Sequence, residues 1–344
     1  MIDPHYTNRF HWLEGLTSFA EIFSDPVKQQ RFEAYLSDGP AYQPPPCAVH
    51  DTTAPGPHGA VPLRVYSPPQ ADATGPGHHP DSHTGLRPGL VWLHGGAFVG
   101  GSLDMPESDG VARELVHRAG AVVVAVDYRL VGGGGFAPKD PGTRLTDHFP
   151  VPHDDVVAAW RWTVQHAPEL GVDPARLALG GASAGGNLAV GAALHLRDDQ
   201  DAVLPARILL AYPVLHATMP MPSPELTAAM ADVPRVLRFL ADDVDLITRT
   251  YLGGAVDPVP AYAMPAHADP AALADLARSS PITIVTCEYD DLRSSGEAFA
   301  GLLRGAGAAV DAQVEAGVLH GHLNESPRLA GTDHTLGLFA QALR

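Results

Sequence analysis

Three residues whose types cooperate in nucleophilic catalysis occur in the order Ser183, Asp290 and His320, each after a short apolar run. A serine hydroxyl is a poor nucleophile at neutral pH. It needs a base within hydrogen-bond reach and a third group that fixes the tautomer of the base and stabilises its cation. Histidine and aspartate supply these two functions. The three positions therefore predict acyl transfer through a covalent intermediate on the serine.

The sequence around Ser183 favours an exposed nucleophile. Residues 181–185 (G-A-S-A-G) match G-x-S-x-G; the apolar run 177–179 precedes them and a helix-like stretch, 187–197, follows. In such a strand-turn-helix the glycines let the two backbones approach closely, and the serine is held on a strained turn above the sheet. A close strand-helix contact without chemistry would give the same pentapeptide, so other parts of the chain have to decide.

A second cluster of small residues, 94–98 (H-G-G-A-F), follows the apolar run 90–93. Paired glycines after a buried strand allow backbone N–H groups to converge on one point, which is how α/β hydrolases hold an oxyanion. The alternative is an ordinary glycine-rich turn, and the presence of Ser183 favours the oxyanion loop. The chain order of serine, acid and histidine, with the glycine loop upstream, is also that of α/β hydrolases.

The composition is that of a globular protein. The chain has 344 residues, 45% of them hydrophobic, and 22 Lys and Arg against 39 Asp and Glu give a net charge of −17. This charge disfavours nucleic acids and anionic membranes as partners. The first residues lack the basic-then-apolar order of a secretory signal, and no stretch approaches the ~20 apolar residues that span a bilayer. We therefore expect a soluble, cytoplasmic protein with no nucleic-acid or membrane partner.

Neither the cysteines nor a histidine-rich loop predicts a cofactor. Cys47 and Cys287 lie far apart and match no metal-ligand spacing, so two reduced, buried thiols are the better interpretation. The Pro/Gly-rich loop 68–89 contains three histidines, but it has no acidic or cysteine partners at fixed spacing. We predict no metal and no cofactor.

Strands and helices alternate over most of the chain. The predicted strands are a hairpin within 47–67, then 90–93, 121–126, 177–179, 206–211, 282–286 and 310–314. The predicted helices between and after them include 110–118, 153–166, 187–197 and 333–343. Alternation with short links predicts an α/β fold with a mostly parallel sheet covered by helices on both faces.

Three segments do not fit this alternation. Residues 1–46 show aromatic residues at helical spacing, which fits either ordinary core helices or a flap over another part of the molecule. Residues 214–262 are Pro-rich and then helical, and we expect them outside the sheet, over its carboxyl edge. Residues 131–148 contain four consecutive glycines, which predicts an irregular, mobile loop.

Taken together, these features resemble the hormone-sensitive lipase family of bacterial carboxylesterases (family IV). The matching segments occur in the family's order across roughly residues 45–344. They are H-G-G-A-F at 94–98, D-Y-R-L at 127–130, G-A-S-A-G-G-N-L at 181–188, Y-P at 212–213, E-Y-D-D-L-R at 288–293 and L-H-G-H at 319–322.

The resemblance implies an α/β-hydrolase fold with a helical cap. On this basis residues 47–213 and 263–344 form the catalytic domain, and residues 1–46 and 214–262 form the cap. The flap interpretation of the first segment is thereby favoured over the core interpretation.

The resemblance also implies the roles in the triad. Ser183 is expected as the nucleophile, His320 as the general base and acid, and Asp290 as the acid that orients the histidine. The family's H-G pair and D-x-L-R spacing select these two residues over their neighbours. Those neighbours are His322, His334 and Asp291.

The oxyanion hole implied by the resemblance consists of the N–H groups of Gly95, Gly96 and Ala184. Two departures from the family pattern stand close to it. Ala97 replaces the usual third glycine, although an N–H is still available there, and Ala182 replaces the acidic residue or threonine that commonly precedes the serine.

The function implied is that of a serine carboxylesterase acting on a small-molecule ester with a short- to medium-chain acyl group. The same triad also serves amides, lactones and thioesters, and the sequence does not separate these. A hydrolase-like receptor that binds a small molecule without turnover is a further alternative, which the presence of His320 disfavours. A homodimer is compatible with the sequence.

Overall fold

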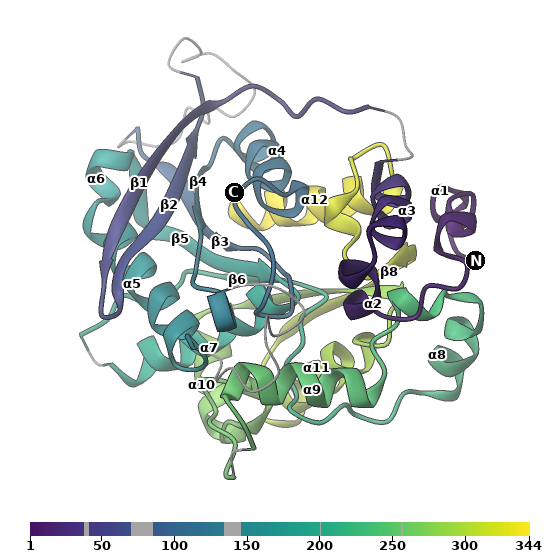
Figure 1. Cartoon of the computed structure of the whole chain (residues 1–344). Helices are drawn as coiled ribbons and strands as arrows, with labels where there is room; N and C mark the ends of the chain where they lie inside the picture. The colour runs from purple at the N-terminus through teal and green to yellow at the C-terminus, as the bar shows by residue number, and fades with distance from the viewer. Residues whose placement is uncertain (38–40, 70–84, 134–145, 200, 256) are drawn as a thin grey trace.

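An eight-stranded sheet runs through the molecule (Figure 1). Its order is β1-β2-β4-β3-β5-β6-β7-β8, in which β1–β2 and β2–β4 are antiparallel and all other neighbours are parallel. The strands are β1 Ala48–Gly56, β2 Gly59–Ser67, β3 Arg87–Leu93, β4 Val122–Val126, β5 Val172–Ala182, β6 Ile208–Ala211, β7 Ile282–Tyr289 and β8 Val310–Leu319. The predicted edge hairpin and mostly parallel sheet are confirmed.

This computed structural model describes residues 1–37, 41–69, 85–133, 146–199, 201–255 and 257–344. Most of the histidine-rich loop predicted over 68–89, and most of the glycine-rich loop predicted over 131–148, lie outside these described residues.

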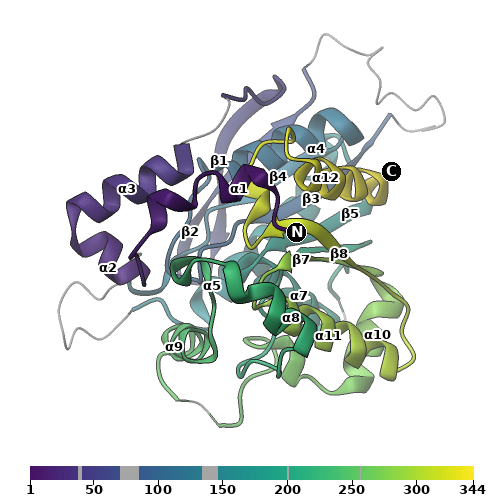
Figure 2. The same ribbon diagram turned by 90° about the vertical axis from the view of Figure 1, so that its right-hand side faces the viewer.

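Helices cover both faces of the sheet, as predicted (Figures 1 and 2). Helices α4 and α12 pack on one face, and α5, α7, α10 and α11 on the other. The helices are α1 Pro4–Thr7, α2 Phe19–Ser24, α3 Pro26–Ser37, α4 Val111–Ala119, α5 Val151–Gln165, α6 Ala167–Leu170, α7 Ala184–Asp198, α8 Pro224–Ala229, α9 Ala241–Leu252, α10 Pro270–Ser279, α11 Arg293–Gly305 and α12 Ala330–Leu343. Of the helices in the described ranges, none is both long and apolar enough to cross a bilayer.

The central strands are apolar on both faces because both faces are covered. In β3, Val91 and Leu93 belong to the core on the α5–α7 side, whereas Leu90 and Trp92 belong to the core on the α4–α12 side. All four side chains are fully buried. A continuous apolar run is the expected pattern for such a strand, since successive side chains point to opposite faces.

Two of the three segments outside the alternating pattern, residues 1–46 and 214–262, pack against each other. Leu13, Ile22 and Tyr35 of the N-terminal segment form a buried cluster with Val236, which precedes α9. Residues 214–255 and 257–262 contain helices and turns and, as predicted, no strand. The N-terminal segment is also fixed to the loop after β8, since buried Arg9 donates to Glu325 Oε1 at 2.8 Å.

Candidate active site

Ser183 occupies the turn between β5 and α7. Its φ of 53° is in the left-handed region, which is strained for a residue with a side chain. The helix comes so close to β3 that a Cβ on Gly185 would lie 2.2 Å from the carbonyl oxygen of Leu93. Glycine is therefore required at that position. The sheet and helix hold Ser183 in a fixed orientation at the end of the strand.

The structure brings Ser183 together with His320 and Asp290. Nε2 of His320, which directly follows β8, lies 3.0 Å from Ser183 Oγ. Nδ1 of the same ring lies 2.7 Å from Oδ2 of Asp290, which directly follows β7. With its proton on Nδ1, the ring donates to the carboxylate and offers a lone pair to the hydroxyl. This continuous chain of hydrogen bonds can remove the serine proton.

The surroundings stabilise the protonated form of His320. Burial by itself lowers the pKa of the ring, but the charge and hydrogen bond of Asp290, together with the charge of Glu107, outweigh burial and raise it. Asp290 is buried, and its second oxygen accepts the Leu292 N–H at 2.9 Å. The carboxylate is therefore fixed at both oxygens and can orient the ring.

Asp291, the neighbour of Asp290, has a different partner. Both of its oxygens accept hydrogen bonds from the Arg238 guanidinium, at 2.8 and 2.9 Å, and one also accepts the Phe239 N–H at 2.9 Å. This carboxylate fixes the segment before α9 to the end of β7.

The two other histidines near His320 also have their own partners. His322 is buried between Cys287 Sγ, 3.3 Å from Nδ1, and Thr335 Oγ1, 2.9 Å from Nε2. His334 is exposed and pairs with Glu315 at 2.6 Å. His322 thus bonds within the core and His334 on the surface, and neither bonds to Ser183.

The predicted oxyanion loop differs from expectation at Gly95. Its only backbone N–H donates to Glu107 Oε2 at 2.6 Å, which argues against Gly95 as an oxyanion donor. The N–H groups of Gly96 and Ala97 have no acceptor within the described ranges, and Ala184 is the first residue of α7, where an N–H has no partner in the helix. Positive φ angles at Gly96 (122°) and Ala97 (53°) turn the loop back on itself.

Glu107 is a residue that the sequence did not single out. It lies fully buried in a single π-helical turn, Pro106–Gly110. Besides the Gly95 N–H, it accepts the hydroxyl of Tyr212 at 2.6 Å and the side-chain amide of Asn324 at 3.3 Å. Burial raises its pKa, and the three donors oppose that effect. One acidic residue in a turn carries no sequence signal, because all of its partners are distant in the chain.

Two aromatic rings pack edge-on against His320. The centroid of Tyr212 lies 4.9 Å and that of Phe239 lies 4.7 Å from the imidazole centroid. Phe239 also lines a cavity of about 280 Å³ with mainly apolar walls, among them Met219, Leu226 and Met230. Phe239 therefore contacts both this cavity and the histidine, although neither His320 nor Ser183 lines the cavity.

Comparisons with known proteins relate the chain to α/β hydrolases and esterases. Residues 90–324 match the Abhydrolase_3 family model, which is described as an α/β-hydrolase fold. The carboxylesterase NlhH of Mycobacterium tuberculosis is 36% identical over 264 residues, which are 77% of this chain and 72% of that protein. An ethyl acetate hydrolase of Pseudomonas putida is 32% identical over 284 residues, 83% of this chain and 78% of its own.

A solved structure is similar over nearly the whole chain. The hyperthermophilic esterase of the archaeon Pyrobaculum calidifontis superposes with a TM-score of 0.74 and 29% sequence identity, covering 99% of this chain and 97% of its own.

Proposed function

Because the chain belongs to the Abhydrolase_3 family of α/β hydrolases, we propose that it cleaves short- to medium-chain esters with Ser183, His320 and Asp290 as its triad. Within that family it is a carboxylic ester hydrolase of the hormone-sensitive lipase group. The observation that carries this proposal is the unbroken hydrogen-bond chain from Ser183 Oγ through His320 to Asp290. All of these groups come from one chain, so the mechanism serves a monomer and a homodimer equally.

The reaction proceeds in two halves. Ser183 Oγ attacks the ester carbonyl carbon while its proton moves to His320 Nε2, and the carbonyl oxygen becomes an oxyanion. The C–O bond to the alcohol then breaks, and the alcohol leaves with the proton from His320. Water attacks the acyl-enzyme in the same way, so that the carboxylic acid is released and the proton returns to Ser183. Asp290 stabilises the imidazolium in both halves.

We propose that the N–H groups of Gly96, Ala97 and Ala184 bind the oxyanion. The free N–H groups of the loop and the first N–H of α7 support this set, and the bond from Gly95 to Glu107 supports a positioning role for Gly95 in place of the donor role predicted from the sequence. Each such donor contributes about 3 kcal/mol to transition-state stabilisation.

We further propose that residues 1–46 and 214–262 form a cap over the site, with residues 47–213 and 263–344 as the catalytic domain. The hydrophobic cluster shared by the two cap segments supports this division. So does the path of the second segment past the triad, where Phe239 packs on His320.

The acyl-chain preference can be measured with 4-nitrophenyl acetate, butyrate, octanoate and palmitate. We expect kcat/KM to be highest for acetate or butyrate and lowest for palmitate. This expectation rests on a similar protein that is named for hydrolysis of ethyl acetate, a short ester.

A preference for palmitate would contradict this proposal. An amide and a thioester with the same butyryl group, and γ-butyrolactone as a lactone with four carbons, provide the comparison of bond type. The ester should give the highest kcat/KM among them, and faster cleavage of another bond would reassign the substrate class.

Glu107→Gln is expected to lower kcat/KM about tenfold, or ~1.4 kcal/mol, because a charge-assisted bond to the Gly95 N–H becomes a neutral one. The charge of Glu107 raises the pKa of His320, so its removal lowers that pKa. Since His320 must be neutral to act as a base, the acid limb of the pH profile should move to lower pH.

Glu114→Gln is the matched control, because Glu114 is also a buried glutamate but bonds to Arg118 and Tyr42 instead. An acid limb that moves equally in both variants, or in neither, would rule out this role for Glu107.

A further inference from the structure

A second cluster of polar side chains lies on the α5–α7 side of the sheet, apart from the triad. His153 and Asp154 are in the first turn of α5, and His195 is in the last turn of α7. The ligand atoms of these three side chains lie within 4.8 Å of one another. The closest pair is His153 Nε2 and His195 Nδ1, at 2.9 Å.

The surrounding residues hold the cluster in place. The ring of Tyr262 lies nearly parallel to both imidazoles, with centroids 5.6 Å from His153 and 5.2 Å from His195. From the turn between β1 and β2, His58 Nε2 bonds to Asp154 Oδ2 at 2.8 Å. The first layer is thus oriented by a second layer of contacts, as ligands of bound metals are.

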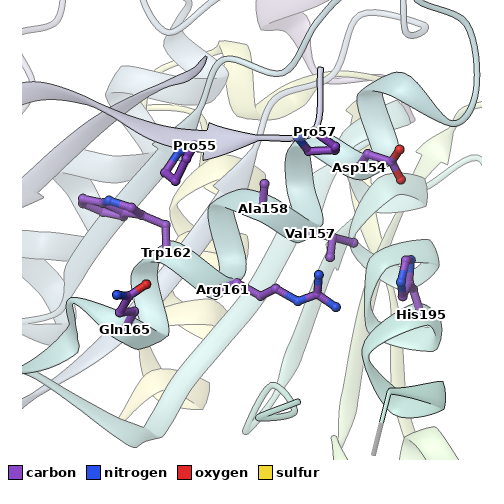
Figure 3. A pocket seen from close by; sticks show the side chains of 9 residues that line it. All are labelled: Pro55, Pro57, Asp154, Val157, Ala158, Arg161, Trp162, Gln165 and His195. Atoms are coloured by element: carbon purple, nitrogen blue, oxygen red, sulfur yellow. The ribbon is translucent and has the colours of Figure 1, made fainter. Parts of the chain in front are cut away.

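The cluster opens to solvent. Asp154 and His195 line one end of a cavity of about 360 Å³ (Figure 3). Arg161 lines the same cavity, but its guanidinium is paired with Asp199 at 2.7 Å. An ion can therefore reach the two half-buried ligands, and the nearby positive charge is neutralised.

We propose that His153 Nε2, His195 Nδ1 and an Asp154 oxygen bind one Zn²⁺ ion. Two imidazoles and one carboxylate are a common ligand set for zinc, with water as the fourth ligand. The same set is a poor one for Mg²⁺ and Ca²⁺, which prefer oxygen ligands throughout.

The required adjustments are small. Ligands at ~2.0–2.1 Å from a tetrahedral ion are about 3.3 Å apart, so the two nitrogens need to separate only slightly from 2.9 Å. The Asp154 oxygen has to approach by about 1.5 Å from at most 4.8 Å, and a side-chain torsion at this half-buried position supplies that movement.

A zinc ion on Nε2 requires the proton of His153 to be on Nδ1, which is buried and lacks a partner in the described part of the chain. Because Gly191 has no side chain, both this nitrogen and the carbonyl oxygen of Tyr262 border the space beside its Cα. They lie 3.5 and 2.1 Å, respectively, from the point that a Cβ of Gly191 would occupy. The Tyr262 carbonyl is therefore the candidate for the second partner that a metal-bound histidine usually has.

Bound zinc would join α5 to α7. His195 is twelve residues beyond Ser183, or about 18 Å along the helix, so the ion stabilises the scaffold and takes no part in acyl transfer. The site is independent of the proposed triad.

Isothermal titration calorimetry with ZnCl₂ tests the proposal on protein first dialysed against a chelator. We expect one Zn²⁺ per chain, a rise in Tm on adding it, and no such effects with MgCl₂. Asp154→Asn and His195→Gln should each raise the Kd for Zn²⁺ about 100-fold. Loss of a second-layer contact alone lowers metal affinity by as much as about 100-fold, so loss of a ligand should cost at least this. His117→Gln on the exposed surface of α4 is the matched control and should bind as the wild type does.

Co²⁺ in place of Zn²⁺ reports the coordination through its visible absorption spectrum, which both ligand variants should lose. Circular dichroism checks that they are folded. Absence of Zn²⁺ binding by the wild type would overturn the proposal, and so would binding that survives unchanged in both ligand variants.

Discussion

Ser183→Ala is expected to lower kcat for 4-nitrophenyl butyrate by about 10⁶, the scale on which loss of a triad nucleophile acts. The reason is geometric as well as chemical. The Ser183 hydroxyl, in the turn between β5 and α7, lies 3.0 Å from His320 Nε2, where the ring can accept its proton. A fluorophosphonate probe, which forms a covalent bond to an activated serine, should label the wild type and leave the variant unlabelled.

Ser280→Ala is the matched control for this experiment. Ser280 is also a buried serine, at the end of α10, and its hydroxyl has no hydrogen-bond partner within the described residues. This variant should keep both turnover and labelling. Near-wild-type turnover by Ser183→Ala, or labelling of it, would mean that another residue is the nucleophile.

Asp290→Asn is expected to lower kcat by about 10⁴, because an amide in place of the carboxylate no longer holds His320 in the tautomer that accepts the serine proton. The charge and hydrogen bond of Asp290 raise the pKa of His320. Their loss lowers that pKa, so the acid limb of the remaining activity should move to lower pH. Steady-state rates measured across the pH range give both quantities.

Asp291→Asn is the matched control, because it removes the charge of the adjacent carboxylate and leaves Asp290 in place. Asp291 pairs with Arg238 and not with His320, so we expect a loss below about tenfold, the scale of one partly exposed ion pair. A larger loss of kcat in Asp291→Asn than in Asp290→Asn would assign the orienting role to Asp291 and contradict the triad proposed above.

The sequence alone predicted much of the scaffold, because local pattern dictates it. The apolar run 90–93 reads as a strand buried on both faces and is one, and the small residues at 181–185 give the sharp turn that the structure shows. Boundaries were less well predicted. β7 and β8 extend to Tyr289 and Leu319, well beyond the predicted ends at 286 and 314. Pairing between the two strands extends each of them through residues whose own hydrophobic pattern does not predict a strand.

The sequence also predicted which residues approach Ser183. Ser183, Asp290 and His320 follow the parallel strands β5, β7 and β8, and this places all three at one edge of the sheet, since parallel strands end on the same side. Motif spacing favoured Asp290 over Asp291 as the acid that orients the histidine. In the structure Asp290 contacts His320, whereas Asp291 pairs with Arg238.

Only the tertiary structure decided the contacts between residues that share no local pattern. The bond from Gly95 to Glu107, which argues against Gly95 as an oxyanion donor, forms because the π-helical turn packs beneath the glycine loop. The cluster of His153, Asp154 and His195 exists because α5 and α7 pack side by side on one face of the sheet. The sequence pattern determines which elements form, but the packing of one element on another determines where some of them end and which side chains meet.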